Sequence, residues 1–132
     1  MTFTVGDVIA ERTIHLTRES LVRYAGASGD FNPIHYRDDI AESVGLPGVL
    51  AHGMLTMGLA SSVVVAALDP QIEITEYGVR FTRPVVVDPQ GGADVSVLAK
   101  VAAVDESSAR IDLTVKHADA TVLVKAQLRV AL

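Results

Sequence analysis

The sequence predicts an α+β protein in which an antiparallel sheet packs against one long apolar helix. Residues 53–68 are apolar around almost the whole helical circumference, which is typical of a buried helix. The second half of the chain contains segments that alternate apolar and polar residues with a period of two, as strands do. Turn-forming residues at Pro70, 89–92 and 105–107 separate these segments. No repeat or linker interrupts the chain, so residues 1–132 are predicted to form a single domain.

The first third of the chain is predicted to be mainly helical and irregular. Val8 to Leu16 has the β-branched content of a short strand. Thr17 is a suitable N-cap for a helix that ends at about Ala25. A second, short helix is predicted over Asp38 to Val44. The residues that form the loop between the two helices are Gly26, Gly29, Asn32 and Pro33.

The rest of the chain is predicted to contain one helix followed by strands. The helix covers Gly53 to Leu68, and because it is apolar all round we expect other structure to wrap it. The outer strand faces are polar, so one face of the sheet is expected to meet solvent or a partner. The predicted strands are Glu73 to Val87, Asp94 to Val104, Arg110 to His117 and Thr121 to Val130.

Composition excludes several classes of function. The chain is 49% hydrophobic and 20% charged, which is enough apolar material for a packed core. A net charge of −5, with 5% aromatic residues and no tryptophan, argues against nucleic-acid binding. The absence of cysteine excludes a disulfide scaffold, a thiolate metal site and a cysteine nucleophile. The four histidines have no metal-ligand spacing, and there is no phosphate or dinucleotide loop, so no metal or cofactor is expected.

Targeting and membrane signals are also weak. Residues 1–7 have neither a basic region nor an apolar stretch, so no signal peptide is expected. The segment Val49 to Leu68 is mostly apolar but too interrupted for a bilayer span. We therefore expect a cytoplasmic protein that does not enter a membrane. The interrupting residues are His52, Gly53, Thr56, Gly58, Ser61 and Ser62.

One short segment carries the residues for chemistry. Asp30, Asn32 and His35 place an acid, an amide and an imidazole within six positions around Pro33. A loop can bring the carboxylate and the imidazole to one pocket, where they would hold and polarise a water molecule. Gly53, at the start of the apolar helix, offers a free backbone N–H to a developing oxyanion. Together these groups could add water to an activated carbonyl compound.

The same residues also have structural interpretations. Asp30 and Asn32 are good turn formers, and His35 can simply bond a backbone carbonyl. His52 is predicted to be structural and to bond a loop carbonyl near the helix start. Both interpretations of the Asp30 to His35 segment remain open from the residues alone.

Two further pairs of polar residues are ambiguous. The hydroxyls of Ser61 and Ser62 can bond back to the preceding helical turn. Arg80 and Arg83 flank Phe81 near the end of a strand. They form either a solvated edge or a contact for a phosphate-bearing carrier, which suits arginine geometry.

The segment from Tyr24 to His35, with Ala51-His52-Gly53-Met54, resembles the hydratase 2 motif of MaoC-like (R)-specific enoyl hydratases and dehydratases. The strand around Val79 to Val85 resembles that family too, and the likeness extends over almost the whole chain. Within the family, the sequence is most similar to the subunits of actinobacterial (3R)-hydroxyacyl-ACP dehydratases, the catalytic B subunit above all. The resemblance implies a hot-dog fold, with a sheet wrapped around a central helix. It also implies a dimer whose sheets join edge to edge.

The resemblance further implies roles for individual residues. Asp30 and His35 match the catalytic pair, and Gly53 matches the position whose N–H polarises the thioester carbonyl. Asn32 and Ser61 match positions close to the substrate. Arg80 and Arg83 are added as candidates for carrier binding, from their chemistry alone.

The expected reaction is reversible syn hydration of trans-2-enoyl thioesters to (3R)-3-hydroxyacyl thioesters in fatty acid metabolism. The substrate carrier is coenzyme A or acyl carrier protein, and the partner is a second copy or a related hot-dog subunit. Three alternatives remain: a hot-dog thioesterase, a catalytic subunit that needs a partner chain, and a non-catalytic subunit. An intact Asp30 and His35 argue against the last.

Overall fold

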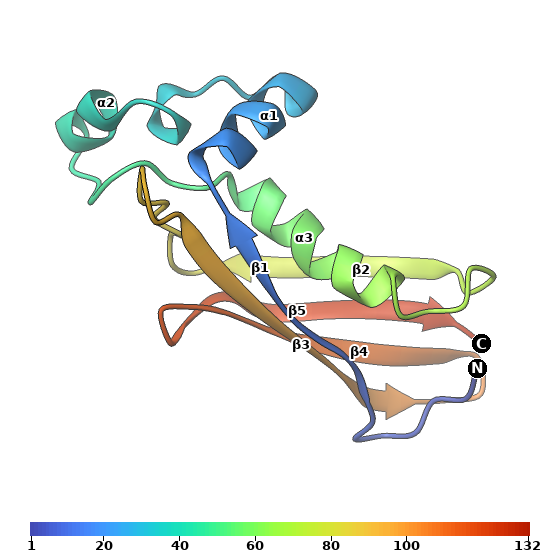
Figure 1. Ribbon diagram of the computed structural model, residues 1–132. Coiled ribbons are helices and arrows are strands. Elements are labelled where there is room, and N and C mark those ends of the chain that lie inside the picture. Colours follow the sequence, from blue (N-terminus) through green and yellow to red (C-terminus); the bar gives the residue numbers. More distant parts are fainter.

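The computed structural model describes all residues, Met1 to Leu132, and shows a five-stranded antiparallel sheet with one long helix on one face (Figure 1). The strands are ordered β1-β3-β4-β5-β2, so β1 and β2 form the two edges. This arrangement confirms the predicted hot-dog fold. The strands are β1 (Val8–Leu16), β2 (Ile74–Phe81), β3 (Ala93–Val104), β4 (Ser108–His117) and β5 (Ala120–Ala131). The helices are α1 (Arg18–Ser28), the 3₁₀ turn η1 (Pro33–His35), α2 (Asp38–Ser43) and α3 (Gly53–Val65).

The core lies between α3 and the inner face of the sheet. Alternate residues of the strands are buried, as the period-two pattern predicted. In the three central strands the buried set includes Val95, Val97, Ala99, Val101, Ala109, Ile111, Val115, Ala126, Leu128 and Val130. Their neighbours in sequence point to the other face, which is mainly polar.

The sheet covers only one side of α3. Thr56, Ala60, Val63 and Val64 are the buried residues of this helix. Met54 and Val65 lie on the opposite side and are 61% and 53% exposed. The prediction that other structure wraps the helix on all sides is therefore wrong for a single chain, because five strands enclose only one of its faces.

Tyr77 fixes the edge strand β2 to α3. Its hydroxyl donates a hydrogen bond of 2.6 Å to the carbonyl oxygen of Met57. Burial raises the pKa of Tyr77 to about 12, so the hydroxyl keeps its proton and remains a donor.

No helix of the structure is both long and apolar enough to cross a membrane.

Two of the predicted helix boundaries are wrong by about one turn. α1 continues to Ser28 rather than ending near Ala25, because Gly26 is accommodated inside the helix. Gly29 ends it with a φ of 77°, a left-handed conformation that glycine adopts without strain. α3 ends at Val65 instead of Leu68, and the chain continues as an irregular turn.

The predicted strand from Glu73 to Val87 is shorter in the structure. β2 ends at Phe81, and Pro84 beyond it has no N–H for a strand ladder. Thr82 still donates its N–H to the carbonyl oxygen of Val122 in β5 at 3.1 Å, whereas residues 85–87 bond to the loop before α3. In this pairing Ala51 donates its N–H to the carbonyl oxygen of Val85 at 2.9 Å, and Val87 donates to Val49 at 2.9 Å. The segment thereby forms one wall beside the N-terminus of α3.

Arg18 holds the small helices over this end of the sheet. Its Nε donates to the carbonyl oxygen of Val87 at 2.6 Å. Its two terminal nitrogens bind both carboxylate oxygens of Asp38 at 3.1 and 2.8 Å. The hydrogen bonds from Arg18 lower the pKa of Asp38. One side chain thus joins α1, α2 and the segment that follows β2.

Candidate active site

Polar side chains fold the loop between α1 and η1. Asp30 Oδ1 accepts the N–H of Asn32 at 3.1 Å, and Asn32 Oδ1 accepts the N–H of Ile34 at 3.2 Å. Asn32 is therefore the N-cap of η1, with Pro33 at its first position. These bonds confirm the predicted turn-forming role of Asp30 and Asn32. They leave the second carboxylate oxygen of Asp30 free for other partners.

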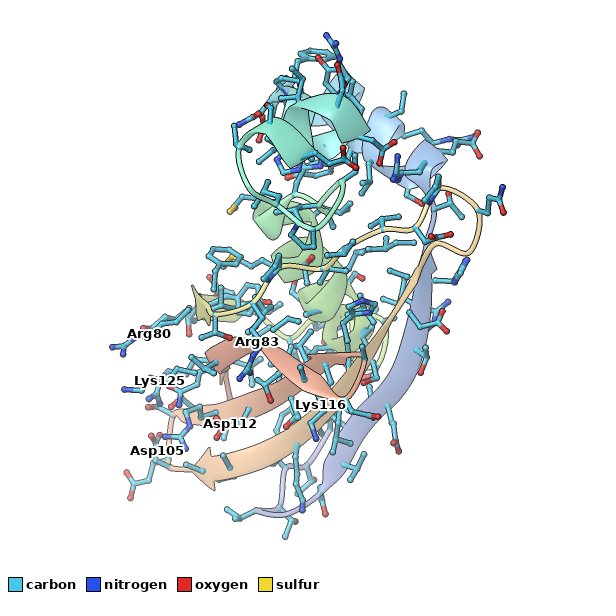
Figure 2. The ribbon with its side chains drawn as sticks, turned by 90° about the vertical axis from the view of Figure 1, so that its left-hand side faces the viewer. Arg80, Arg83, Asp105, Asp112, Lys116 and Lys125 are labelled. Atoms are coloured by element: carbon cyan, nitrogen blue, oxygen red, sulfur yellow. The ribbon has the colours of Figure 1, made fainter.

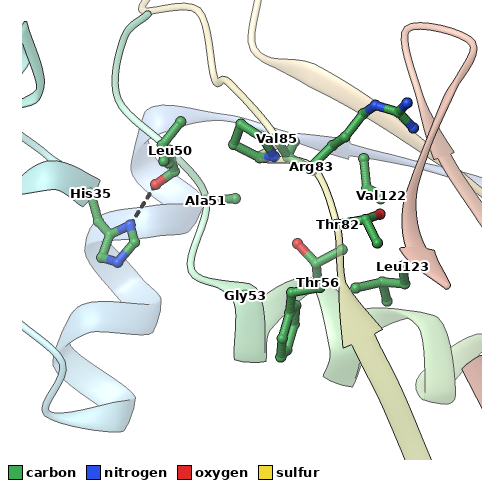
Figure 3. A pocket seen from close by; sticks show the side chains of 12 residues that line it. His35, Leu50, Ala51, Gly53, Thr56, Thr82, Arg83, Val85, Val122 and Leu123 are labelled. Carbon is green, nitrogen blue, oxygen red and sulfur yellow. Dashed lines mark hydrogen bonds between the residues drawn. The ribbon is translucent and has the colours of Figure 1, made fainter. Parts of the chain in front are cut away.

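The position of His35 determines which of its nitrogens is available. The ring is buried, and Nδ1 lies 2.6 Å from the carbonyl oxygen of Leu50 (Figure 3). A carbonyl only accepts, so Nδ1 donates the hydrogen. In the neutral ring Nε2 therefore carries the lone pair that a general base needs. The predicted bond to a backbone carbonyl and the predicted catalytic role are thus compatible.

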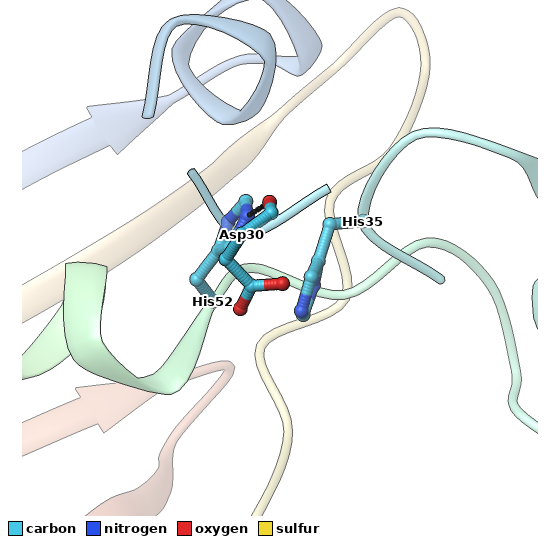
Figure 4. A group of neighbouring side chains, drawn as sticks. All are labelled: Asp30, His35 and His52. Carbon is cyan, nitrogen blue, oxygen red and sulfur yellow. Dashed lines mark hydrogen bonds between the residues drawn. The ribbon is translucent and has the colours of Figure 1, made fainter. Parts of the chain in front are cut away.

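Asp30, His35 and His52 form one cluster (Figure 4). One ligand-type atom from each lies within 4.8 Å of those from the other two. The rings of His35 and His52 are stacked, with centroids 3.8 Å apart and planes at 23°. The nitrogen lone pairs lie in these nearly parallel planes and cannot converge on a single ion at bonding distance. This arrangement of the rings does not offer the converging lone pairs that a chelated metal ion needs.

His52 lies at the base of this cluster. Its Nε2 lies 3.1 Å from the backbone carbonyl oxygen of Asp30, so this nitrogen donates, and the predicted bond to a loop carbonyl is confirmed. Tyr24 contacts the same ring edge to face, with centroids 4.7 Å apart. Burial lowers the pKa of His52, which favours a neutral ring.

Gly53 is the first residue of α3, and its N–H has no partner within the helix. The Phe81 ring packs closely on it, since a Cβ at residue 53 would lie 3.0 Å from Phe81 Cε1. A Cβ here would require the Phe81 ring to move by a few tenths of an ångström, so glycine suits this close approach. The free N–H stands at the positive end of the helix dipole, where a negative oxygen is stabilised.

A cavity of about 340 Å³ opens beside these groups (Figure 3). Both His35 and Gly53 line it, and Arg83 stands among the residues that follow β2. Half of the lining is apolar, which suits an acyl chain better than a polar metabolite. The lining residues are His35, Leu50, Ala51, Gly53, Thr56, Phe81, Thr82, Arg83, Pro84, Val85, Val122 and Leu123.

The other predicted site residues, which are Asp30, Asn32, Ser61 and Arg80, do not line this cavity, and Asp30 adjoins it only through its neighbour His35. Asn32 is occupied in the turn, and Ser61 donates its hydroxyl to the carbonyl oxygen of Gly58 at 2.9 Å. The predicted back-bonding is thus confirmed for Ser61, and Ser62 bonds Leu59 in the same way. Arg80 projects outward from the sheet, beside Lys125 (Figure 2).

Several cavity residues were not predicted from the sequence. Thr56 is 2% exposed, and a hydroxyl residue in the first turns of an apolar helix was a usable signal. Phe81 lines the cavity together with Val122 and Leu123 of β5. No sequence pattern marks these apolar residues, because β2, β5 and α3 are distant in the sequence and contact one another only in the tertiary structure.

Comparison with known proteins agrees with this fold. The family described as MaoC like domain matches residues 4–121. The chain is 34% identical over 84 residues to the 3-hydroxyacyl-thioester dehydratase X of Mycobacterium tuberculosis, which covers 63% of this chain and 29% of that protein. It spans at most 64% of the length of the curated relatives it matches.

Two solved structures show the same arrangement. The R-hydratase PhaJ1 from Pseudomonas aeruginosa superposes with a TM-score of 0.82 and 28% identity, over 98% of this chain and 81% of that one. The ChsH1-ChsH2 complex from Mycobacterium tuberculosis superposes with a TM-score of 0.87 and 20% identity, over 99% of both chains, and shares the fold. The match over residues 4–121 identifies this chain as a member of the MaoC-like domain family.

Proposed function

We propose that the protein catalyses the reversible hydration of trans-2-enoyl thioesters to (3R)-3-hydroxyacyl thioesters in fatty acid metabolism. The observation that carries this proposal is the bond from His35 Nδ1 to Leu50, which leaves Nε2 as a base beside the Asp30 carboxylate. The dehydratase and hydratase names of the related proteins support the same chemistry.

A water molecule bound between Asp30 and His35 would be the nucleophile. As its oxygen bonds to C3, His35 Nε2 takes one of its protons, and the electrons of the C2–C3 double bond move into the thioester carbonyl. His35 then returns that proton to C2. Because one group takes and gives the proton, both additions occur on the same face, which gives the syn product. Asp30 accepts a hydrogen bond from the other water hydrogen, which stays on the oxygen and becomes the hydroxyl hydrogen of the product. The carboxylate also stabilises the imidazolium of His35.

The thioester oxygen becomes negative during this reaction. The N–H of Gly53 lies at the start of α3 and lines the same cavity, so it can donate to that oxygen. The reverse reaction uses the same groups: His35 removes the C2 proton and then protonates the departing hydroxyl. No cofactor is needed for this proton balance.

We also propose that Arg83 and Arg80 contact the phosphates of the acyl carrier. Arg83 lines the cavity, and its Nη1 donates to the carbonyl oxygen of Thr121 at 3.2 Å, so the guanidinium keeps other N–H donors free. Neither arginine takes part in an ion pair with a carboxylate, and Lys125 adds a third unpaired cation nearby. Asn32 and Ser61 do not line the cavity, so the substrate contacts predicted for them carry no part of this proposal.

Incubation of the purified chain with crotonyl-CoA and with a longer trans-2-enoyl-CoA tests the main proposal. We expect loss of the enoyl absorbance and formation of the (3R)-3-hydroxyacyl thioester, identified by chiral chromatography. The same substrates on acyl carrier protein distinguish the two carriers. Release of free thiol without a hydroxy product would indicate the thioesterase alternative, in which water attacks the carbonyl carbon. Lack of turnover with every substrate would overturn the proposal for the isolated chain.

A partner subunit is proposed from surfaces that the single chain leaves open. The free face of α3 exposes Met54 and Val65, and the edge strand β2 exposes Ile74 and Phe81. An open strand edge beside an apolar face favours pairing with another chain. We propose that a second hot-dog subunit covers both, as the ChsH1-ChsH2 structure shows that chains of this fold form complexes.

Native mass spectrometry of the purified chain is expected to show twice the 14.0 kDa chain mass. Val65→Lys should shift the protein to the single-chain mass, because a charge on the free α3 face opposes burial there. Val22→Lys is the matched control, since Val22 is similarly exposed on α1 but far from β2. A single-chain mass for the unaltered protein would instead indicate a different subunit as the partner.

A further inference from the structure

His52 is a buried polar residue that the proposed mechanism does not use. It is 1% exposed and stands at the N-cap of α3, directly before Gly53. Its side chain makes no capping bond to the helix that it precedes. A buried imidazole without a capping role is costly, so its contacts must be explained in another way.

The contacts of His52 reach both members of the catalytic pair (Figure 4). Its Nε2–H bonds the backbone carbonyl oxygen of Asp30 at 3.1 Å. The face of its ring stacks on His35 at 3.8 Å. The next residue in the chain, Gly53, carries the oxyanion N–H. One side chain therefore touches or adjoins all three proposed catalytic groups, two from the segment between α1 and α2 and one from the start of α3.

The second ring nitrogen of His52 contributes no hydrogen bond, so the Nε2 bond and the ring contacts are what hold this side chain in place. Nδ1 is buried and has no hydrogen-bond partner. Because Nε2 donates to a carbonyl, Nδ1 is the unprotonated nitrogen of a neutral ring. A neutral ring can stack on His35 when that residue becomes an imidazolium, whereas a charged ring would repel it. The cost of the unpaired Nδ1 is offset by the stack and by the bond to Asp30.

We propose that His52 is a positioning residue that sets the distances between Asp30, His35 and the Gly53 N–H. These distances must allow the first two to share one water and all three to act on one thioester. This inference rests on the proposed function. The bond to the Asp30 carbonyl holds the loop after α1 against the start of α3. The bond to Leu50 alone would leave the His35 ring free to tilt, and stacking on His52 fixes the angle of the ring.

Two substitutions separate the two contacts. His52→Gln keeps an amide N–H at the place of Nε2 and removes the ring, whereas His52→Phe keeps the ring and removes the donor. Each is expected to lower kcat by about 10- to 100-fold while KM changes by less than about threefold, because small displacements of reacting groups mainly affect the chemical step. His15→Gln is the matched control: His15 is exposed and bonds Asp94 on the sheet surface, so kcat should not change.

A second measurement tests whether His52 acts through Asp30. In an Asp30→Asn background, His52→Phe should cost less than about threefold, because misplacing an inactive group has little further effect. If kcat of the double variant falls by the product of the two single-variant factors, positioning through Asp30 is overturned. Variants that turn over like the unaltered protein would overturn the whole inference while leaving the proposed function intact. An inactive unaltered protein would overturn both. Thermal melts of His52→Gln and His52→Phe distinguish a displaced catalytic group from an unfolded protein. If one of these two variants does not fold, the kcat of the other tests the proposal.

Discussion

Asp30→Asn is expected to lower kcat for enoyl-thioester hydration by about 10² to 10⁴, with little change in the melting temperature. The amide oxygen of asparagine can still accept the N–H of Asn32, which Asp30 Oδ1 now accepts at 3.1 Å, so the turn is retained. The loss arises because a neutral amide can neither accept the water hydrogen with full strength nor stabilise an imidazolium at His35. Initial rates over a range of substrate concentrations measure the effect.

Asp119→Asn is the control for this change. Asp119 lies in the β4–β5 hairpin turn with a φ of 60°, a conformation that asparagine tolerates well. Asp119 belongs neither to the cluster of Asp30, His35 and His52 nor to the cavity lining, so kcat should stay within about twofold. An Asp30→Asn protein that folds normally and turns over at the unaltered rate would contradict the proposed mechanism.

Gly53→Pro is expected to lower kcat by about 10² to 10³, because it removes the N–H proposed as the oxyanion donor. Proline is well suited to the first position of a helix, where no intrahelical bond is lost. His52 precedes it with φ −59° and ψ 132°, a conformation that residues before proline favour. The helix should therefore start at the same residue, and circular dichroism should be unchanged.

Gly53→Ala separates the missing N–H from the added side chain. Both variants bring a Cβ to within 3.0 Å of the Phe81 ring, but only alanine keeps the N–H. The proline variant should therefore be slower than the alanine variant by the factor that the N–H contributes. Equal rates for the two variants would show that Gly53 is required for space beside Phe81 and that its N–H does not act on the substrate.

Local patterns in the sequence were sufficient for the sheet and the helix. The alternation of Ile111, Leu113 and Val115 identified β4, because side chains of a strand point to opposite faces. The error in β2 fell where tertiary contacts override local preference, because the residues after Phe81 pair with the loop before α3. The error in α1 has a local cause: the helix passes the exposed Gly26 and ends at Gly29, which supplies the left-handed C-cap.

The candidate site was predictable where chemistry and turn formation fall on neighbouring residues. Asp30, Asn32 and His35 are close in sequence, and the motif around Gly53 is compact. The roles within the site were not predictable, since the free nitrogen of His35 depends on the carbonyl of Leu50, fifteen residues away. The stacking of His52 on His35 likewise depends on how α3 meets the loop.

The sequence by itself determined the fold class and the central apolar helix, and it supplied Asp30, His35 and Gly53 as the candidates for the site. These follow from periodicity and from short-range turn chemistry, which act over a few residues. Only the tertiary structure decided which nitrogen of His35 is free, how His52 holds Asp30, and which face of α3 stays open. Those features arise where β2, β5, α3 and the loop before α3 converge, and contacts between segments distant in the chain leave no local pattern in the sequence.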